Sequence, residues 1–248
     1  MRIWDVHPGY LNRQSLLGEH RELHAVVAII EEGKSGYANH PETNRWRGYG
    51  WALRMRHALL ASEMALRGYS DRSPVTSESR LGEWPALYVD PPGRQFELLA
   101  AKYAEREQGR INLPRSTQEL WSHHKYSVLA RNVQEYQSIG REVASESVGF
   151  AELAVRLIEL LRVRPREKGI RNAAQHMWGY VSGAATGDRE RYASNLEIDS
   201  TGRSALRPLL DAIAGRASAC GKTYLLHSTA LSELSIWLPE ERSPGREE

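Results

Sequence analysis

The stretch MRIWDVHPGYLNRQSLLGEHRELHAV (residues 1–26) contains the first strong structural signal of the chain. From Leu16 onward, apolar residues recur at helical spacing through Leu23 and Ile30, and charged residues such as Glu19 and Glu22 lie between them. This pattern predicts an amphipathic α-helix over residues 14–32. Because similar patterns return along the chain and strand-like alternation is nearly absent, we predict an all-α fold.

Most of the remaining sequence also favours helices. They are predicted over residues 51–67, 96–107, 117–132, 133–145, 152–163, 170–183, 189–196, 203–219 and 223–237. Residues 33–50 indicate a loop or short helix, and residues 70–93 an ordered or semi-ordered connection. We therefore expect two helical domains, at residues 1–112 and 113–240, and a disordered tail at 241–248.

Composition limits the class of protein. The chain has 248 residues, of which 41% are hydrophobic and 26% charged, as in ordinary globular proteins. No apolar run approaches the roughly 18 residues that a membrane-spanning helix needs. Cys220 is the one cysteine, so no internal disulfide is expected. These features favour a cytoplasmic protein without membrane contact. The net charge of +2 is too small to indicate an acidic partner.

The first residues suggest a chemistry. Residues 1–26 do not have the form of a secretion signal, and Arg2 disfavours methionine removal, so we expect Met1 to begin the mature chain. A chain-terminal amine is less basic than a lysine amine, and an appreciable fraction is an uncharged nucleophile at neutral pH. Such an amine forms a Schiff base with a sugar C1′ or a carbonyl. Glu22 is the candidate acid/base group if the N-terminal segment folds back over the first helix.

Three stretches carry a family resemblance. MRIWDVHPGYLNRQSLLGEHREL, GKSGYANHPE and RMRHALLASEMALRGY together resemble the pyrimidine-dimer DNA glycosylases of the phage endonuclease V type, over about residues 1–110. The resemblance implies a DNA-repair glycosylase that acts on damaged double-stranded DNA through a terminal amine. It also implies that β-elimination nicks the strand, which is AP-lyase activity, and that no metal or cofactor is required.

The resemblance also implies roles for individual residues. Met1 supplies the nucleophilic amine and Glu22 is the catalytic glutamate. The implied DNA contacts are Arg2, Gln14 and Arg21. Ala25 stands where the family has a further DNA-binding arginine, so other arginines are candidates for the missing phosphate contacts: Arg45, Arg47, Arg54 and Arg56.

Structural alternatives exist for these residues. Glu22 beside Arg21 on a helix is commonly a surface ion pair. Arg54, Arg56 and His57 are expected on the exposed side of the helix over residues 51–67. The aromatic residues Trp46, Tyr49 and Trp51 are able to stack on bases, and core packing is favoured at least for Trp51.

The second half has a separate resemblance. WSHHKYSVLARNVQEYQSIGREVA and RNAAQHMWGYVSG resemble the helical YbgA-like family, which has no settled activity. A pocket for a nucleobase, phosphate or nucleic-acid strand is suggested by His123, His124, Lys125, Arg131, His176 and Tyr180. The structural alternative is buried hydrogen bonding between helices, favoured for His176. No zinc site is expected, because Cys220 is alone and the histidines lack compact ligand spacing.

The leading functional hypothesis is a DNA glycosylase with AP-lyase activity. Two alternatives stay open at this stage. One is a non-catalytic nucleic-acid-binding or adaptor protein, and the other is an enzyme that acts on modified nucleobases or RNA.

Overall fold

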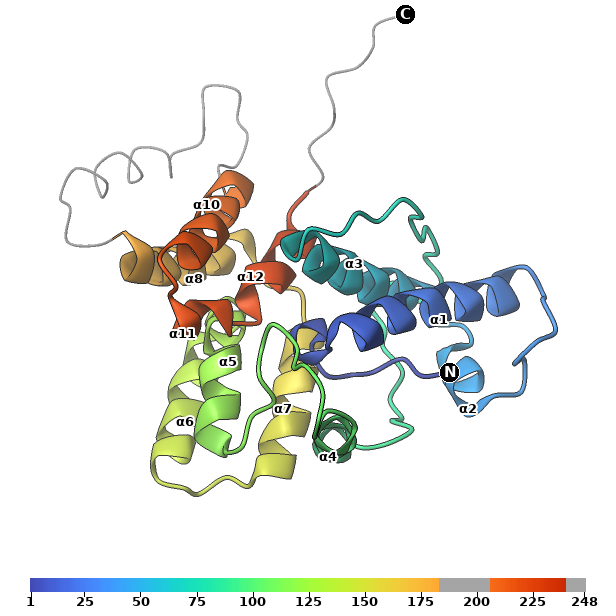
Figure 1. Cartoon of the computed structure of the whole chain (residues 1–248), viewed down its shortest axis with the longest axis horizontal. Coiled ribbons are helices and arrows are strands. Elements are labelled where there is room, and N and C mark those ends of the chain that lie inside the picture. The colour runs from blue at the N-terminus through green and yellow to red at the C-terminus, as the bar shows by residue number, and fades with distance from the viewer. Residues whose placement is uncertain (183–205, 240–248) are drawn as a thin grey trace, which may run out of the picture.

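The computed structural model describes residues 1–182 and 206–239, and every regular element in these ranges is helical (Figure 1). The first half comprises η1 (Pro8–Tyr10), α1 (Arg13–Glu31), α2 (Pro41–Trp46), α3 (Gly50–Leu66) and α4 (Pro92–Lys102). The second half comprises α5 (Thr117–Leu129), α6 (Val133–Ala144), α7 (Phe150–Arg162), α8 (Glu167–Val181), α10 (Leu206–Ala219), α11 (Thr223–Leu226), α12 (Ala230–Glu233) and η2 (Leu234–Trp237). The all-α prediction is confirmed.

Helix α1 forms for the reasons that its sequence indicates. The side-chain oxygen of Asn12 accepts a hydrogen bond from the Ser15 amide at 2.9 Å and caps the helix start. Leu16, Leu23 and Val26 recur at helical spacing and are buried. This apolar face packs α1 against α3 and α2, which fixes the direction of every polar side chain that α1 carries.

Helix α4 is shifted from its predicted bounds. It covers Pro92–Lys102 in place of residues 96–107, so the predicted position was wrong by about one turn. Pro91 and Pro92 explain the earlier start, because proline has a backbone angle suited to the first helical turn and lacks the amide hydrogen that would stay unpaired there. The preceding segment, residues 67–91, contains no helix, in agreement with the predicted connection.

The single helix predicted over residues 223–237 is also wrong. Three short pieces, α11, α12 and η2, take its place. Arg110 donates to the carbonyl oxygens of Leu226 and Ser228, and the Thr229 amide donates to the His123 carbonyl at 2.9 Å. A continuous helix needs these backbone groups for its own ladder, so contacts with other elements break it.

The two halves are packed together. Helix α3 contacts α12 and η2, and α4 contacts α7. The buried hydrophobic side chains form one cluster that runs from Ile3 to Leu238. The domain limits at residues 112 and 113 stay a prediction, since the halves share this core. Three predicted features lie outside the described residues: the helix at 189–196, the start of the helix at 203–219, and the tail at 241–248.

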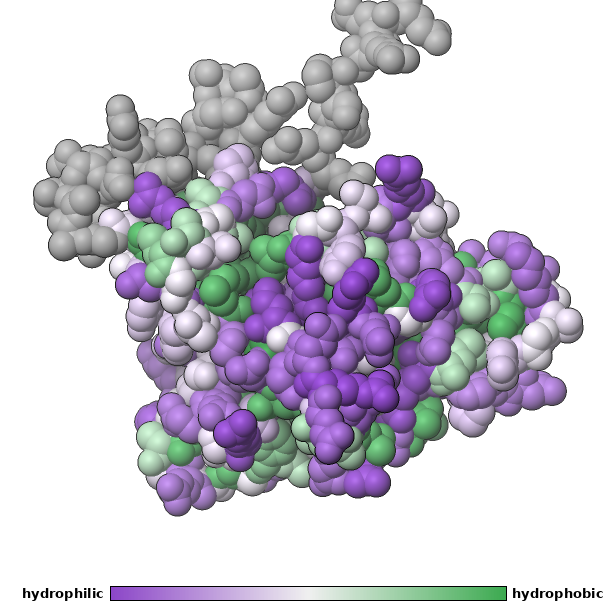
Figure 2. Space-filling model, in the orientation of Figure 1, coloured by the Kyte–Doolittle hydropathy of each residue, from purple (hydrophilic) through white to green (hydrophobic). Residues whose placement is uncertain are grey.

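The face of the molecule shown in Figure 2 is predominantly polar. On the face shown in Figure 2, hydrophilic residues cover the centre, and hydrophobic surface forms smaller areas between them. Within residues 1–182 and 206–239, no helix combines the length and apolar character needed to cross a membrane.

A buried ionic cluster joins the halves. The Glu63 carboxylate on α3 accepts hydrogen bonds from Arg110 Nη2 at 2.7 Å, Arg67 Nε at 2.8 Å and Ser232 Oγ at 2.7 Å. Burial raises the pKa of Glu63, but Arg110 and Arg67 outweigh it and hold the pKa at about 2. The carboxylate is therefore charged in the folded protein at neutral pH, and it links α3 to Arg110 and to α12.

Replacing Glu63 by Gln is predicted to destabilise the protein in a pH-dependent way. A folded pKa of about 2, against a usual value of 4.5, contributes stability above pH 4.5 that is lost as the pH falls toward 2. Glu63→Gln removes this contribution and leaves Arg110 and Arg67 without their carboxylate partner. We expect the free energy of unfolding to fall by about 3–5 kcal/mol at pH 7. Urea unfolding of both proteins at several pH values measures this, and the difference between them should shrink between pH 4.5 and 2.

Glu97→Gln is the matched control, because Glu97 is 67% exposed and pairs with the exposed Arg94 one turn away. Its effect should stay below about 1 kcal/mol at every pH. A difference between wild type and Glu63→Gln that does not change with pH would contradict the ionic role of Glu63.

Candidate functional site

Residues 1–7 precede η1 and belong to no helix, yet much of this N-terminal segment is buried. Ile3 and Val6 are each 1% exposed. Buried backbone groups outside regular structure need hydrogen-bond partners from elsewhere. Side chains provide them, because Gln95 Oε1 accepts from the Asp5 amide at 2.8 Å and Arg56 Nη1 donates to the Val6 carbonyl at 3.0 Å.

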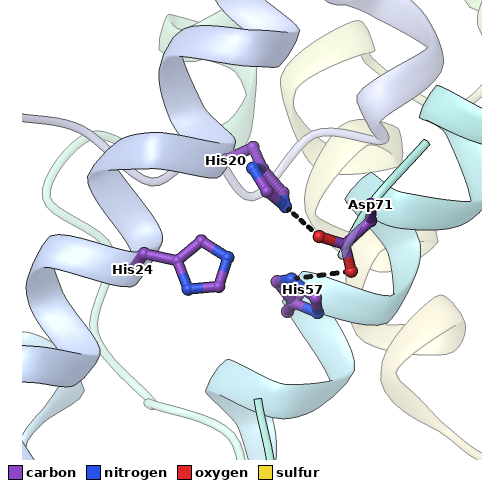
Figure 3. Close-up of side chains that lie close together, drawn as sticks. All are labelled: His20, His24, His57 and Asp71. Atoms are coloured by element: carbon purple, nitrogen blue, oxygen red, sulfur yellow. Dashed lines mark hydrogen bonds and ion pairs between the residues drawn. The ribbon is translucent and has the colours of Figure 1, made fainter. Parts of the chain in front are cut away.

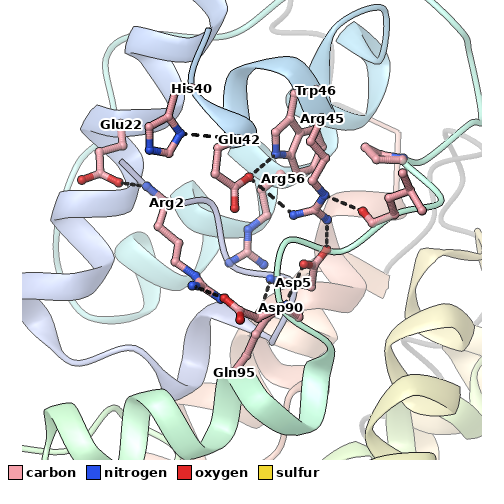
Figure 4. Close-up of polar contacts among 12 residues, drawn as sticks. Arg2, Asp5, Glu22, His40, Glu42, Arg45, Trp46, Arg56, Asp90 and Gln95 are labelled. Carbon is pink, nitrogen blue, oxygen red and sulfur yellow. Dashed lines mark hydrogen bonds and ion pairs between the residues drawn. The ribbon is translucent and has the colours of Figure 1, made fainter. Parts of the chain in front are cut away.

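Glu22 provides the third anchor of the N-terminal segment. Its Oε2 accepts a hydrogen bond from the backbone amide of Arg2 (Figure 4). The Met1 nitrogen is three covalent bonds from the Arg2 nitrogen, which limits their separation to roughly 3–4 Å. The side chain of Met1 is partly buried against the hydrophobic core. The segment therefore folds back to α1, and the Glu22 carboxylate lies close to the first residue.

The Arg2 side chain has its own partners. Its Nη1 lies 2.6 Å from Asp90 Oδ2, and the guanidinium stacks over the Trp4 ring at 4.2 Å from the centroid. The side chain is 25% exposed. Arg2 thus joins the N-terminal segment to the end of the 67–91 connection and keeps a solvent-facing edge.

Asp5 lies at the centre of a buried polar network (Figure 4). Its side chain is 2% exposed and accepts hydrogen bonds from Arg45 Nη2, from Gln95 Nε2 at 2.9 Å, and from Arg162 Nη2 at 2.8 Å. Arg162 is the last residue of α7, so the second half of the chain reaches the N-terminal segment directly. None of Asp5, Gln95 and Arg162 was predicted as a site residue, because their separation in sequence hides the contact.

Arg56 is buried, which corrects the sequence-based expectation. It is 3% exposed and forms a bidentate pair with Glu19, with its Nε at 2.7 Å from Oε1 and its Nη2 at 3.0 Å from Oε2. Burial raises the pKa of Glu19 to about 7, against the lowering effect of Arg56. His57 is likewise buried, at 5% exposure. The predicted exposed side of this helix is wrong for both residues, because Glu19 accepts the Arg56 guanidinium and the His57 ring packs against the rings of His20 and His24.

The other predicted DNA-contact residues divide into two groups. The Arg45 side chain is 5% exposed, and its charge is paired with Asp5 and Glu42. Gln14, Arg21 and Arg47 are exposed, and Arg54 is 35% exposed and pairs with Glu78 at 3.2 Å. Within the described residues, neither Arg21 nor Arg47 forms an ion pair, and both donate only to uncharged groups. The surface-accessible group is thus smaller than the sequence indicated.

The aromatic candidates are mostly structural. Trp51 is 8% exposed and packs in the core, as favoured from the sequence. Trp46 is 1% exposed, and its indole nitrogen donates to Glu42 Oε2 at 3.1 Å. Tyr49 is partly buried, and the Arg80 guanidinium lies 4.8 Å from its ring centroid.

The second-half candidates do not gather around one pocket. His123 and His124 are buried, and their Nδ1 atoms lie 3.1 and 3.4 Å from the Tyr10 hydroxyl. Burial lowers the pKa of His123 to about 3 and that of His124 to about 4, so both are neutral at pH 7. Arg131 is 2% exposed and pairs with Glu233 at 2.9 Å. These three residues support the packing of α5 against other elements.

The remaining second-half candidates lie at the surface. His176 is exposed, so the buried hydrogen-bonding role favoured from the sequence is wrong. Tyr180 is 51% exposed, and Lys125 Nζ lies 5.9 Å from its ring and 4.7 Å from that of Tyr224. Lys125 Nζ also lies 4.8 Å from the ring of Tyr126, so it interacts with tyrosines on α5, α8 and α11, which the sequence did not indicate.

A further group of side chains was missed. His20, His24, His57 and Asp71 place four potential ligand atoms within 4.8 Å of one another. The separation of His20 and His24 by four residues was a visible signal, because residues at this spacing share a helix face. His57 and Asp71 are far away in sequence, so the complete cluster emerges only in the fold.

Two family models match separate parts of the chain. One, described as pyrimidine dimer DNA glycosylase, matches residues 1–77, and the other, described as a protein of unknown function (DUF1722), matches residues 125–234. Both resemblances seen in the sequence are confirmed, the second being the YbgA-like family. No curated protein and no solved structure matched the chain. Residues 1–77 are thus similar to DNA-repair glycosylases, and they contain Glu22 together with the N-terminal segment.

Replacing Arg56 by Met is predicted to lower the free energy of unfolding by about 3–5 kcal/mol, because it leaves Glu19 buried without a charged partner. Arg54→Met is the matched control on the same helix, since the Arg54–Glu78 pair is partly exposed at 35% and 69%. The control should lose less than about 1 kcal/mol. Urea unfolding measures both, and equal losses would contradict the assignment of Arg56 to the interior.

Proposed function

We propose that this protein is a DNA glycosylase with AP-lyase activity that acts on pyrimidine-dimer damage in double-stranded DNA. The nucleophile is the α-amine of Met1, and Glu22 is the acid/base group. The observation that carries the proposal is the hydrogen bond from the Arg2 amide to Glu22, which keeps a carboxylate close to the first residue. The match of residues 1–77 to the pyrimidine dimer DNA glycosylase family supports the substrate class.

The chemistry requires an uncharged amine and a group that moves protons. The amine lone pair forms a bond to C1′ while the glycosidic bond breaks. The electron pair of the glycosidic bond leaves with the base, which gains a proton. Loss of a proton from nitrogen and opening of the sugar ring at O4′ give a protonated Schiff base. Removal of a C2′ proton then expels the 3′-phosphate oxygen and nicks the strand. Glu22 accepts and returns these protons and stabilises the cationic intermediate.

A purely structural role for Glu22 is the main competing explanation. The carboxylate already anchors the Arg2 amide, and a partly buried acceptor with that task needs no catalytic function. The two roles differ in what a glutamine does at the same position. Glutamine keeps a side-chain oxygen that accepts the Arg2 amide but does not act as an acid or base at neutral pH.

The proposed DNA interface consists of residues that are accessible on the folded protein. Arg21, Arg47 and the partly exposed Arg54 hold phosphates, Gln14 is a polar contact near the first turn of α1, and Arg2 contributes the edge that Asp90 leaves free. Phosphate contacts position a duplex without reading its sequence. Arg45 and Arg56 are left out of the interface, because buried carboxylates already neutralise them.

Borohydride trapping on ultraviolet-irradiated duplex DNA tests the mechanism. The wild-type chain is expected to form a covalent adduct that peptide mapping assigns to the N-terminal nitrogen. Glu22→Gln should lower the trapping rate by at least about 100-fold, because general acid/base catalysis contributes on that scale, while the unfolding midpoint stays near that of wild type. Intact-mass measurement first establishes that Met1 carries a free amine.

Four outcomes contradict this mechanism. An adduct on another residue places the nucleophile elsewhere, and an unchanged trapping rate in Glu22→Gln limits Glu22 to anchoring. Tight DNA binding without any adduct favours the non-catalytic binding or adaptor function. If irradiated DNA is neither bound nor trapped, modified nucleobases or RNA become the substrates to assay.

If these arginines contact phosphates, removing them should make DNA binding less dependent on salt concentration. Each phosphate contact adds about 0.9 to the slope of log K against log salt for duplex DNA. The double variant Arg21→Gln with Arg47→Gln should therefore weaken binding and reduce the slope by about 2 in fluorescence anisotropy titrations. Arg94→Gln is the control, because Arg94 is 56% exposed but paired with Glu97 at 2.6 Å. Equal slopes in the double variant and the wild type would contradict this interface.

A further inference from the structure

Four side chains from three elements converge beside α1 (Figure 3). His20 and His24 lie one turn apart on α1, His57 lies on α3, and Asp71 follows α3 in the 67–91 connection. One ligand atom from each residue can be chosen so that all lie within 4.8 Å of one another. Three imidazoles and one carboxylate are ligand types that transition metals and zinc prefer in proteins.

The contacts inside the cluster leave part of its hydrogen-bonding capacity unused. His20 Nε2 lies 3.2 Å from Asp71 Oδ1, and His57 Nε2 lies 3.5 Å from Asp71 Oδ2. The Nε2 atoms of His24 and His57 are shielded from solvent and have no hydrogen-bond partner. Most buried polar atoms in proteins have a partner, so two such nitrogens in one cluster call for a further ligand.

The imidazoles are close enough to act together. Ring centroids of His20 and His24 are 4.7 Å apart, those of His24 and His57 4.9 Å, and those of His20 and His57 5.1 Å. The side chains of His57 and Asp71 are 6% and 16% exposed, which limits competition from water.

We propose that His20, His24, His57 and Asp71 bind a zinc ion. Tetrahedral zinc with bonds of 2.0–2.2 Å places its ligand atoms roughly 3.3 Å apart, so side-chain movements on the order of 1 Å contract the cluster to this geometry. The ion accepts the lone pairs of the two unpartnered nitrogens, and Asp71 neutralises one of its charges. Magnesium and calcium ions do not suit this site, because they prefer oxygen ligands and three of the four ligands here are imidazole nitrogens.

Zinc at this position ties three elements together. It links α1 to α3 and to the start of the 67–91 connection, whose other end carries Asp90, the partner of Arg2. Four protein ligands are typical of structural zinc sites. His57 and Asp71 also line an open groove with Arg54, Glu78 and Trp237, so the ion is reachable from the surface. This site does not depend on the proposed glycosylase activity.

Zinc titration of the full chain without an affinity tag tests the proposal. After treatment with chelator and dialysis, the protein is expected to bind one Zn²⁺ per chain in calorimetry and to gain several degrees in unfolding temperature. Mg²⁺ should produce neither effect. Replacing zinc by Co²⁺ should give the intense visible absorption of a four-coordinate site, a readout that does not depend on any variant.

Two substitutions locate the ion. His24→Ala removes a ligand, and Asp71→Asn keeps the shape of the side chain but removes its charge. Each should weaken Zn²⁺ binding by about 100-fold or more. Residues that only hydrogen-bond to a ligand have smaller effects on metal affinity when they are altered. His176→Ala is the matched control, since His176 is exposed on α8 and should leave affinity unchanged. No Zn²⁺ binding by the wild type, or affinities in His24→Ala and Asp71→Asn equal to wild type, would overturn the proposal.

Discussion

The N-terminal segment is buried without regular secondary structure, and this constraint organises the molecule. Its backbone groups have no helical ladder, so side chains must replace water as their partners. Glu22 from α1, Gln95 from α4 and Arg56 from α3 do so. The three helices are thereby tied to one short stretch of chain, and the position of the first residue is set by contacts with distant parts of the sequence.

The same segment and the η1 turn after it connect the two halves of the chain. Asp5 in the segment pairs with Arg162 of α7, and the hydroxyl of Tyr10 in η1 contacts His123 and His124 of α5. Buried charges are costly unless they are paired, so these contacts favour one relative placement of the halves. The second half thus supports the N-terminal segment physically. A role in DNA contact is not needed to explain why the two parts occur together.

Sequence periodicity predicted the helices well and the environment of their polar residues poorly. The buried face of α1 is predicted by the spacing of Leu16, Leu23 and Val26, because the spacing of apolar residues follows directly from helix geometry. Arg56 and His57 were placed at the surface because charge usually indicates exposure. Glu19 accepts Arg56 in the interior, and the His57 ring packs against those of His20 and His24. Such pairings join residues that are distant in sequence, and a single sequence does not reveal them.

The five residues Glu19, His20, Arg21, Glu22 and Leu23 belong to the first of the three stretches that carry the family resemblance, and they show why a motif alone does not identify a catalyst. Successive residues of a helix point about 100° apart, so each meets a different environment. Glu19 pairs with Arg56, His20 with Asp71, and Leu23 enters the core. Arg21 is exposed, and Glu22 accepts a hydrogen bond from the Arg2 amide. Both glutamates are partly or fully buried acids on one helix, and it is the contact with the Arg2 amide that singles out Glu22 as the candidate for chemistry at the chain terminus.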